Sequence, residues 1–131
     1  MAFQQRKKDY LQRLIEEFFA KLHKLTNEKE HISLLEKTQL LVSGFQFFYE
    51  NFDIKLTDTA NDILEKIGDY ELSEQYARLL VVEYECLEED GNKDSLSKAL
   101  EIVEYLINTD TTYSWDRSVI REDILRLLEK S

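Results

Sequence analysis

The sequence predicts an all-α protein, and three observations support that fold class. Proline is absent and only three glycines occur in 131 residues, a composition that suits long helices joined by short turns. Apolar residues recur at a spacing near 3.6 through most of the chain. No stretch alternates between apolar and polar residues between turn signals, so no sheet is predicted. We expect about six helices in antiparallel hairpins, forming one domain over residues 1–131 as a bundle or a short repeat-like array.

The first two helices are predicted over about residues 6–25 and 30–52. The apolar stripe of the first helix contains Leu11, Ile15, Phe18, Leu22 and Leu25. The second helix ends in GFQFFYENF, residues 44–52, whose rings continue one apolar stripe: Leu34, Leu35, Leu41, Val42, Phe45, Phe48, Tyr49 and Phe52. Both stripes have the width of a core face. This placement favours a core over a ligand site as the reason for so many rings.

A second apolar strip on the same helix contains Leu40, Gly44 and Phe47. Glycine inside a helix costs about 1 kcal/mol relative to alanine, so another segment is expected to pass close to Gly44. That segment is a neighbouring helix, either within the chain or in a second copy. We predict that this strip is an interaction surface, with a symmetric homodimer as its simplest use.

Four more helices are predicted in the rest of the chain. One begins at Thr57 as its N-cap and ends at Gly68, which tolerates the left-handed conformation after a helix. The next covers about 71–89 and ends at Gly91, with apolar residues around most of its middle. The last two cover about 94–108 and 115–130. Their apolar positions are Leu96, Leu100, Val103, Ile107, Ile120, Ile124, Leu127 and Leu128.

Composition predicts a cytoplasmic protein. The single cysteine, Cys86, cannot form a disulfide within the chain. The N-terminus has no apolar signal-peptide region, and no apolar run approaches the roughly 18 residues of a membrane span. No membrane association is therefore expected.

The charge distribution argues against nucleic acid as a partner. The net charge is −10, with +1 over residues 1–50 and −11 over residues 51–131. An acidic surface repels a phosphate backbone, and only the short basic run at Arg6, Lys7 and Lys8 would attract one. The acidic run from Glu83 to Asp94 could bind a basic partner or a cation weakly, or form an ordinary solvated face.

The sequence contains few side chains suited to catalysis or metal binding. His23 and His31 flank a predicted turn, where Glu28 or Glu30 could complete a metal site, although their spacing matches no known ligand motif. Cys86 lies between carboxylates, which disfavour its thiolate and fit a buried, inert residue. No nucleophile, zinc or phosphate-binding motif occurs, so no cofactor is expected and enzyme activity has no support.

Residues 61–84, NDILEKIGDYELSEQYARLLVVEY, resemble the middle of a tetratricopeptide repeat. The likeness rests on Gly68, Asp69 and Tyr70 at the turn and on Ser73 in the second helix. It implies a helical hairpin in which the tyrosine lies between the helices and the small residue permits their close approach. No second copy follows 34 residues later. Separately, the segment KDYLQRLIEEFFAKLHKL, residues 8–25, is similar to the start of small all-helical bacterial proteins of unknown function.

The sequence as a whole favours a non-catalytic helical module that binds another protein or itself. The alternative is a small metal-binding protein or enzyme that uses the turn between His23 and His31. A flat apolar surface would favour the first function, and a closed polar pocket with converging histidine and carboxylate groups would favour the second.

Overall fold

The computed structural model describes residues 9–20, 34–87, 93–110 and 115–129, which form six α-helices and no strand. The all-α prediction is therefore confirmed. The chain divides into two compact units, Met1–Gln46 and Phe47–Ser131, and the boundary falls inside α2 (Leu34–Phe52). The first unit contains the helix over residues 9–20 and the start of α2. The prediction of a single domain over the whole chain stays a prediction.

The helix over residues 9–20 buries one face. Leu11, Ile15 and Phe19 are buried and recur every four residues. Leu11 and Ile15 belong to the predicted stripe, whereas Phe18 of that stripe is only half-buried. The Phe18 ring contacts that of Phe19 edge to face, with centroids 5.3 Å apart. Leu22 and Leu25, which the sequence adds to this stripe, lie outside the described residues.

Helix α2 buries a narrower face than its sequence predicts. Leu41 and Phe48 are buried, whereas Val42 is 61 % exposed and Tyr49 is 51 % exposed. Val42 and Tyr49 are turned about 100° from their buried neighbours, so they lie at the edge of the apolar stripe. The Phe48 ring packs edge to face on Tyr76 of α4 (Tyr70–Leu87), with centroids 4.9 Å apart. Both residues belong to the second unit, so this contact lies within it.

Helix α3 (Ala60–Ile67) begins two residues later than expected, so the prediction of Thr57 as its N-cap is wrong. Thr59 is the N-cap: its side chain accepts a hydrogen bond from the Asp62 backbone N–H, and the Asp62 carboxylate accepts one from the Thr59 N–H. Thr57 has Ala60 three residues later, which cannot complete such a capping box. The end of the helix is as predicted, because Gly68 adopts φ 64° and ψ 23°.

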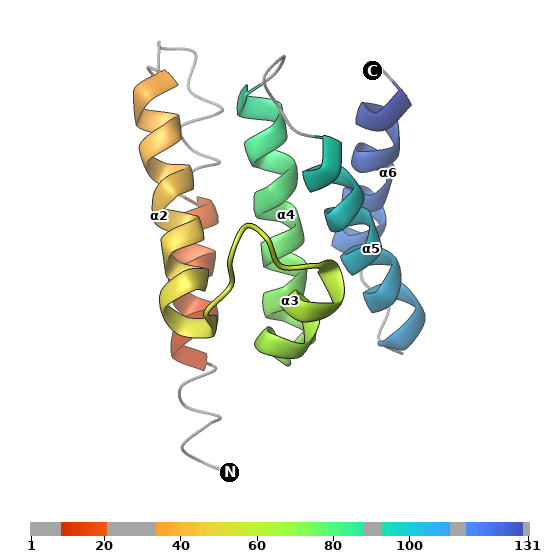
Figure 1. The fold of residues 1–131 in the computed structure, drawn as a ribbon, viewed down its shortest axis with the longest axis horizontal. Coiled ribbons are helices and arrows are strands. Elements are labelled where there is room, and N and C mark those ends of the chain that lie inside the picture. The colour runs from red at the N-terminus through yellow and green to blue at the C-terminus, as the bar shows by residue number, and fades with distance from the viewer. Residues whose placement is uncertain (1–8, 21–33, 88–92, 111–114, 130–131) are drawn as a thin grey trace. The chain divides into compact units, whose positions relative to one another are not determined.

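Helices α4, α5 (Lys93–Thr109) and α6 (Trp115–Glu129) form the main packing of the second unit. Each of the three contacts the other two, and α3 contacts α4 and α5. Successive helices run in opposite directions, so α4 and α6 point the same way (Figure 1). Three small residues of α4 and α5 are buried: Ser73, Ala77 and Ala99. The large buried side chains of α5 are Leu96, Ile102, Val103 and Leu106.

No helix in the described part of the chain combines the length and apolar character needed to cross a membrane.

Candidate functional site

A groove lies between α4 and α6, and the residues that line it have the same spacing on both helices. Because the helices run in the same direction, positions 78, 81, 82 and 85 of α4 face positions 116, 119, 120 and 123 of α6. This is the spacing of one helical face over two turns. The lining residues are Arg78, Val81, Val82, Glu85, Asp116, Val119, Ile120 and Asp123.

The middle of the α4/α6 groove is apolar. Val81 and Ile120 are buried at its base, Val82 is half-buried, and Val119 is 37 % exposed at its edge. The groove encloses about 130 Å³. Pockets for small-molecule ligands usually enclose about 300–1,000 Å³. The groove is therefore smaller than such a pocket.

The two ends of the groove carry different charges. Arg78 and Asp116 lie at one end, and the carboxylates of Glu85 and Asp123 lie at the other. Glu85 is solvent-exposed as a residue, but desolvation of its carboxyl group beside α6 raises its pKa, and the nearby Asp123 carboxylate raises it further. Arg126 moderates this effect and forms an ion pair with Asp123 at 3.1 Å. Glu85 is therefore held in a site that disfavours its negative charge.

Two exposed apolar residues continue this surface along α6. Trp115 is 70 % exposed, and Val119 follows one turn later on the same face of the helix. On the opposite side of α6, the buried Arg117 forms ion pairs with Glu74 of α4 and Asp110 after α5. These bonds fix the position of α6 against α4 and thus the width of the groove.

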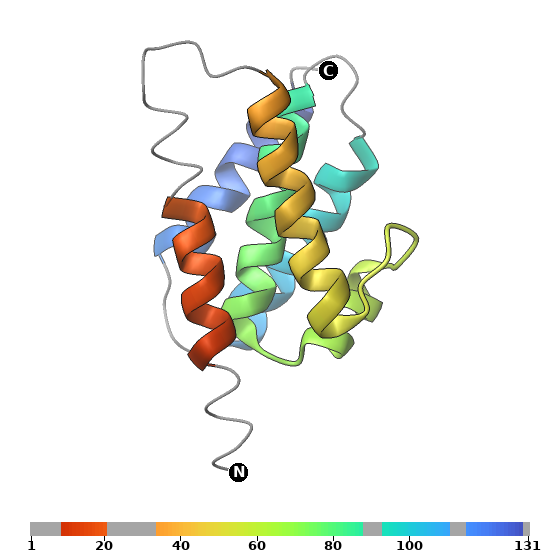
Figure 2. The same ribbon diagram turned by 90° about the vertical axis from the view of Figure 1, so that its left-hand side faces the viewer.

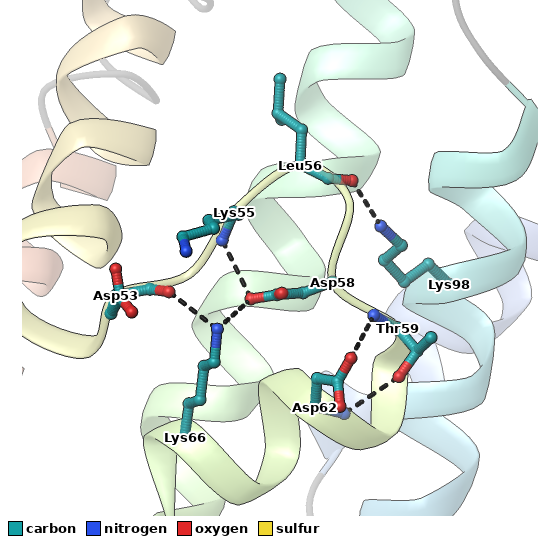
Figure 3. A network of polar contacts seen from close by, with 8 residues as sticks. All are labelled: Asp53, Lys55, Leu56, Asp58, Thr59, Asp62, Lys66 and Lys98. Carbon is teal, nitrogen blue, oxygen red and sulfur yellow. Dashed lines mark hydrogen bonds and ion pairs between the residues drawn. The ribbon is translucent and has the colours of Figure 1, made fainter.

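The connector between α2 and α3, residues 53–59, is a second candidate surface. Lys66 donates hydrogen bonds to the Asp53 carbonyl at 2.9 Å and to the Asp58 carboxylate at 2.6 Å. Lys98 of α5 donates to the Leu56 carbonyl at 3.2 Å. The Leu56 side chain is 78 % exposed and points away from these bonds (Figure 3). The connector projects from the helices it joins (Figure 2). The Leu56 side chain is therefore exposed on a backbone that the lysine hydrogen bonds hold in position.

A larger hollow, of about 420 Å³, lies between α5 and α6. Its lining residues are Glu104, Ile107, Asn108, Ser118, Arg121 and Glu122. Arg121 and Glu104 form an ion pair at 3.5 Å, and both side chains are more than two-fifths exposed. An ion pair this exposed contributes little to stability.

The interaction strip predicted on α2 is only partly accessible. Gly44 is buried, and Leu40 and Phe47 are half-buried. The Phe47 ring contacts Phe48 edge to face, with centroids 5.1 Å apart. The use of this strip in a homodimer stays a prediction.

The predicted metal-site residues His23, Glu28, Glu30 and His31 lie outside the described residues, as does part of the acidic run from Glu83 to Asp94. The Cys86 side chain is not described either. Within the described residues, no three His, Cys, Asp or Glu side chains come together in a way that could hold a metal ion.

The residues that carry the repeat resemblance differ in exposure. The Tyr70 side chain is 40 % exposed at the start of α4, whereas Ser73 is buried. Helices α3 and α4 do contact each other. The resemblance itself stays an expectation.

Sequence reasoning missed the α4/α6 groove, although two signals for it were present. Helix α4 has more apolar residues than one core face needs, including Val81 and Val82. Trp115 and Val119 add apolar surface to α6 outside the stripe of Ile120 and Ile124. The pairing of positions 78–85 with 116–123 depends on how two helices separated by a third align, and no local pattern specifies that.

Comparison with protein-family models, curated proteins and solved structures found no match to this chain.

Proposed function

We propose that this chain is a helical protein-interaction module whose contact surface is centred on α6. The observation that carries the proposal is the 70 % exposure of Trp115. Trp115 lies one helical turn before Val119, which lines the apolar middle of the α4/α6 groove. Single exposed apolar residues are common on protein surfaces. Tryptophan beside an apolar groove is different, because aromatic anchors next to pockets dominate the energetics of many interfaces.

The arrangement suits binding because α6 is held rigidly. Arg117 of α6 forms ion pairs with Glu74 of α4 and with Asp110, the residue after α5. Little of the α6 surface therefore has to become ordered when a partner binds.

Affinity capture from the native cell extract, with quantification of the captured proteins, tests this function. The bait carries Trp115→Ala together with Val119→Ser, and the control bait carries Tyr105→Ala. Tyr105 is an exposed aromatic residue on α5 that does not line the groove. We expect at least one protein to be captured by the wild type and the control and to be lost with the double variant. Each captured protein is then purified and titrated against the wild type and both variants.

If no captured protein depends on Trp115 and Val119, the surface on α6 is not the interface. Circular dichroism of each bait shows that loss of capture does not arise from unfolding. Light scattering on the wild type separates binding of another protein from binding of a second copy.

A further inference from the structure

The α4/α6 groove has a charge asymmetry that specifies the chemistry of its partner. Glu85 and Asp123 lie at the end of the groove nearest the C-terminus of α4, which ends at Leu87. A helix C-terminus carries partial negative charge, and α4 has no basic residue in its last turn. Desolvation and the Asp123 carboxylate also raise the pKa of Glu85. Arg126 already pairs with Asp123 at 3.1 Å and lowers the pKa of Glu85, so it neutralises part of this charge. Two carboxylates and the helix C-terminus still face this one cation, and together they favour a second one at this end of the groove.

The apolar middle of the groove determines what else the partner must carry. Val81, Val82, Val119 and Ile120 lie about one turn from the two carboxylates along both helices. A bare cation would leave these side chains uncovered. A lysine or arginine beside an aliphatic residue matches both features, because its methylene stem covers apolar surface while its charge reaches the carboxylates.

The length of the groove indicates the form of the partner. The seven residue steps from position 78 to position 85 of α4 span about 10 Å, or two turns. An amphipathic helix laid between two parallel helices presents side chains at matching intervals. The charge of −11 over residues 51–131 attracts a basic segment at longer range.

We infer that the α4/α6 groove binds a basic amphipathic helix of another protein, with an aliphatic side chain over Val82 and Val119 and a lysine or arginine at Glu85 and Asp123. This inference rests on the proposed function, since it names the chemical class of the partner.

The fluorescence of Trp115 can report binding in the groove, because Trp115 is the only tryptophan in the chain and lies one turn from Val119. The probe is a tryptophan-free, 14-residue peptide of leucine and lysine in an amphipathic helical pattern, with both ends capped. One control peptide has the same composition in scrambled order, and another has serine in place of leucine. Binding is followed by Trp115 fluorescence in the full chain.

We expect saturable binding of the amphipathic peptide and at least about tenfold weaker binding of both control peptides. Glu85→Gln combined with Asp123→Asn should weaken binding of the amphipathic peptide by about tenfold. The matched control combines Glu65→Gln on α3 with Glu101→Gln on α5. It removes the same number of charges from exposed positions outside the groove, and it should bind as the wild type does.

Three results would overturn the inference. Equal weakening in both double variants would show that the peptide senses only the overall charge. Equal binding of the serine peptide would show that the apolar floor is not used. Concentration-dependent dimers that dissociate when Glu85 and Asp123 are neutralised would make a second copy the occupant.

Absence of peptide binding would also overturn it, and the capture experiment then separates the two proposals. If captured proteins still depend on Trp115 and Val119, the interaction module stands and only the basic partner is wrong. If they do not, both proposals fall.

Discussion

Arg117 on α6 donates a hydrogen bond from Nε to Oε1 of Glu74 on α4 at 2.6 Å, across 43 positions of the chain. Its Nη1 donates to Oδ2 of Asp110, directly after α5, at 2.7 Å. The Arg117 side chain is only 5 % exposed. One cation therefore joins all three main helices of the second unit, and it does so away from water, where an unpaired charge is costly.

Arg117→Met should destabilise the fold by about 3–5 kcal/mol, because it leaves two largely buried carboxylates without their cation. Urea unfolding measures the loss. Arg121→Met is the matched control on the same helix. Arg121 pairs with Glu104 at 3.5 Å in a largely exposed position, and its replacement should cost less than about 1 kcal/mol. Equal effects of the two variants would mean that the buried pairs contribute no more than a surface pair.

Replacing both acids as well should recover part of the stability lost in Arg117→Met. The triple variant with Glu74→Gln and Asp110→Asn also removes the two negative charges that pair with Arg117. A triple variant less stable than Arg117→Met would show that the carboxylates are stabilised by other groups.

Gly68→Ala should destabilise the chain by about 1 kcal/mol, because a Cβ is unfavourable at positive φ. Gly68 has φ +64°, and the nearest atom to an added Cβ would be the Glu65 carbonyl oxygen at 3.9 Å. Steric crowding is therefore absent, and the whole cost comes from the backbone conformation. Gly68→Asn should cost less, since asparagine tolerates this region better. Urea midpoints of the two variants decide the order, and an unchanged midpoint for alanine would contradict the explanation.

Asp58 should stabilise the connector at neutral pH and lose this effect in acid. The hydrogen bond from Lys66 lowers the pKa of the Asp58 carboxyl, and the backbone N–H of Lys55 lowers it further. A carboxyl group with a lowered folded-state pKa stabilises the fold above its unfolded pKa. That stabilisation disappears as the pH falls through the folded-state pKa.

Asp58→Asn should thus lower the Tm at pH 7, and the difference from the wild type should shrink steadily as the pH is lowered. Thermal unfolding followed by circular dichroism gives both values. Glu65→Gln, at an exposed position on the neighbouring α3, controls for the change in net charge. A difference that stays constant with pH would mean that the Asp58 charge does not contribute.

Phe47→Glu should reduce self-association if the strip of Leu40, Gly44 and Phe47 forms a homodimer contact. The substitution places a carboxylate in an apolar contact on both subunits. Tyr49→Glu on the exposed edge of α2 is the control and should leave the assembly unchanged. Light scattering gives the mass of each variant. A wild type that stays monomeric at high micromolar concentration removes the hypothesis, and unfolding of Phe47→Glu would show that its ring is needed within the chain.

Local sequence determined the helices of this protein. The absence of proline, the 3.6-residue periodicity and Gly68 predict all-α structure and one helix end correctly, because these effects act within a few residues of the backbone. The wrong N-cap is also local: Asp62 can return a hydrogen bond to Thr59, whereas nothing suitably placed can return one to Thr57.

Tertiary structure alone decided which apolar residues are covered and where charges meet. Val42 and Tyr49 extend the α2 stripe in the sequence, yet they are exposed because burial depends on the width of the surface they face. In the sequence, Arg117 cannot be distinguished from an exposed polar residue of a surface helix. Its partners Glu74 and Asp110 come from other segments, and only the fold places them beside it. The α4/α6 groove exists because α5 returns α6 beside α4 in the same direction. Such a pairing depends on the packing of three helices, and helical periodicity carries no information about it.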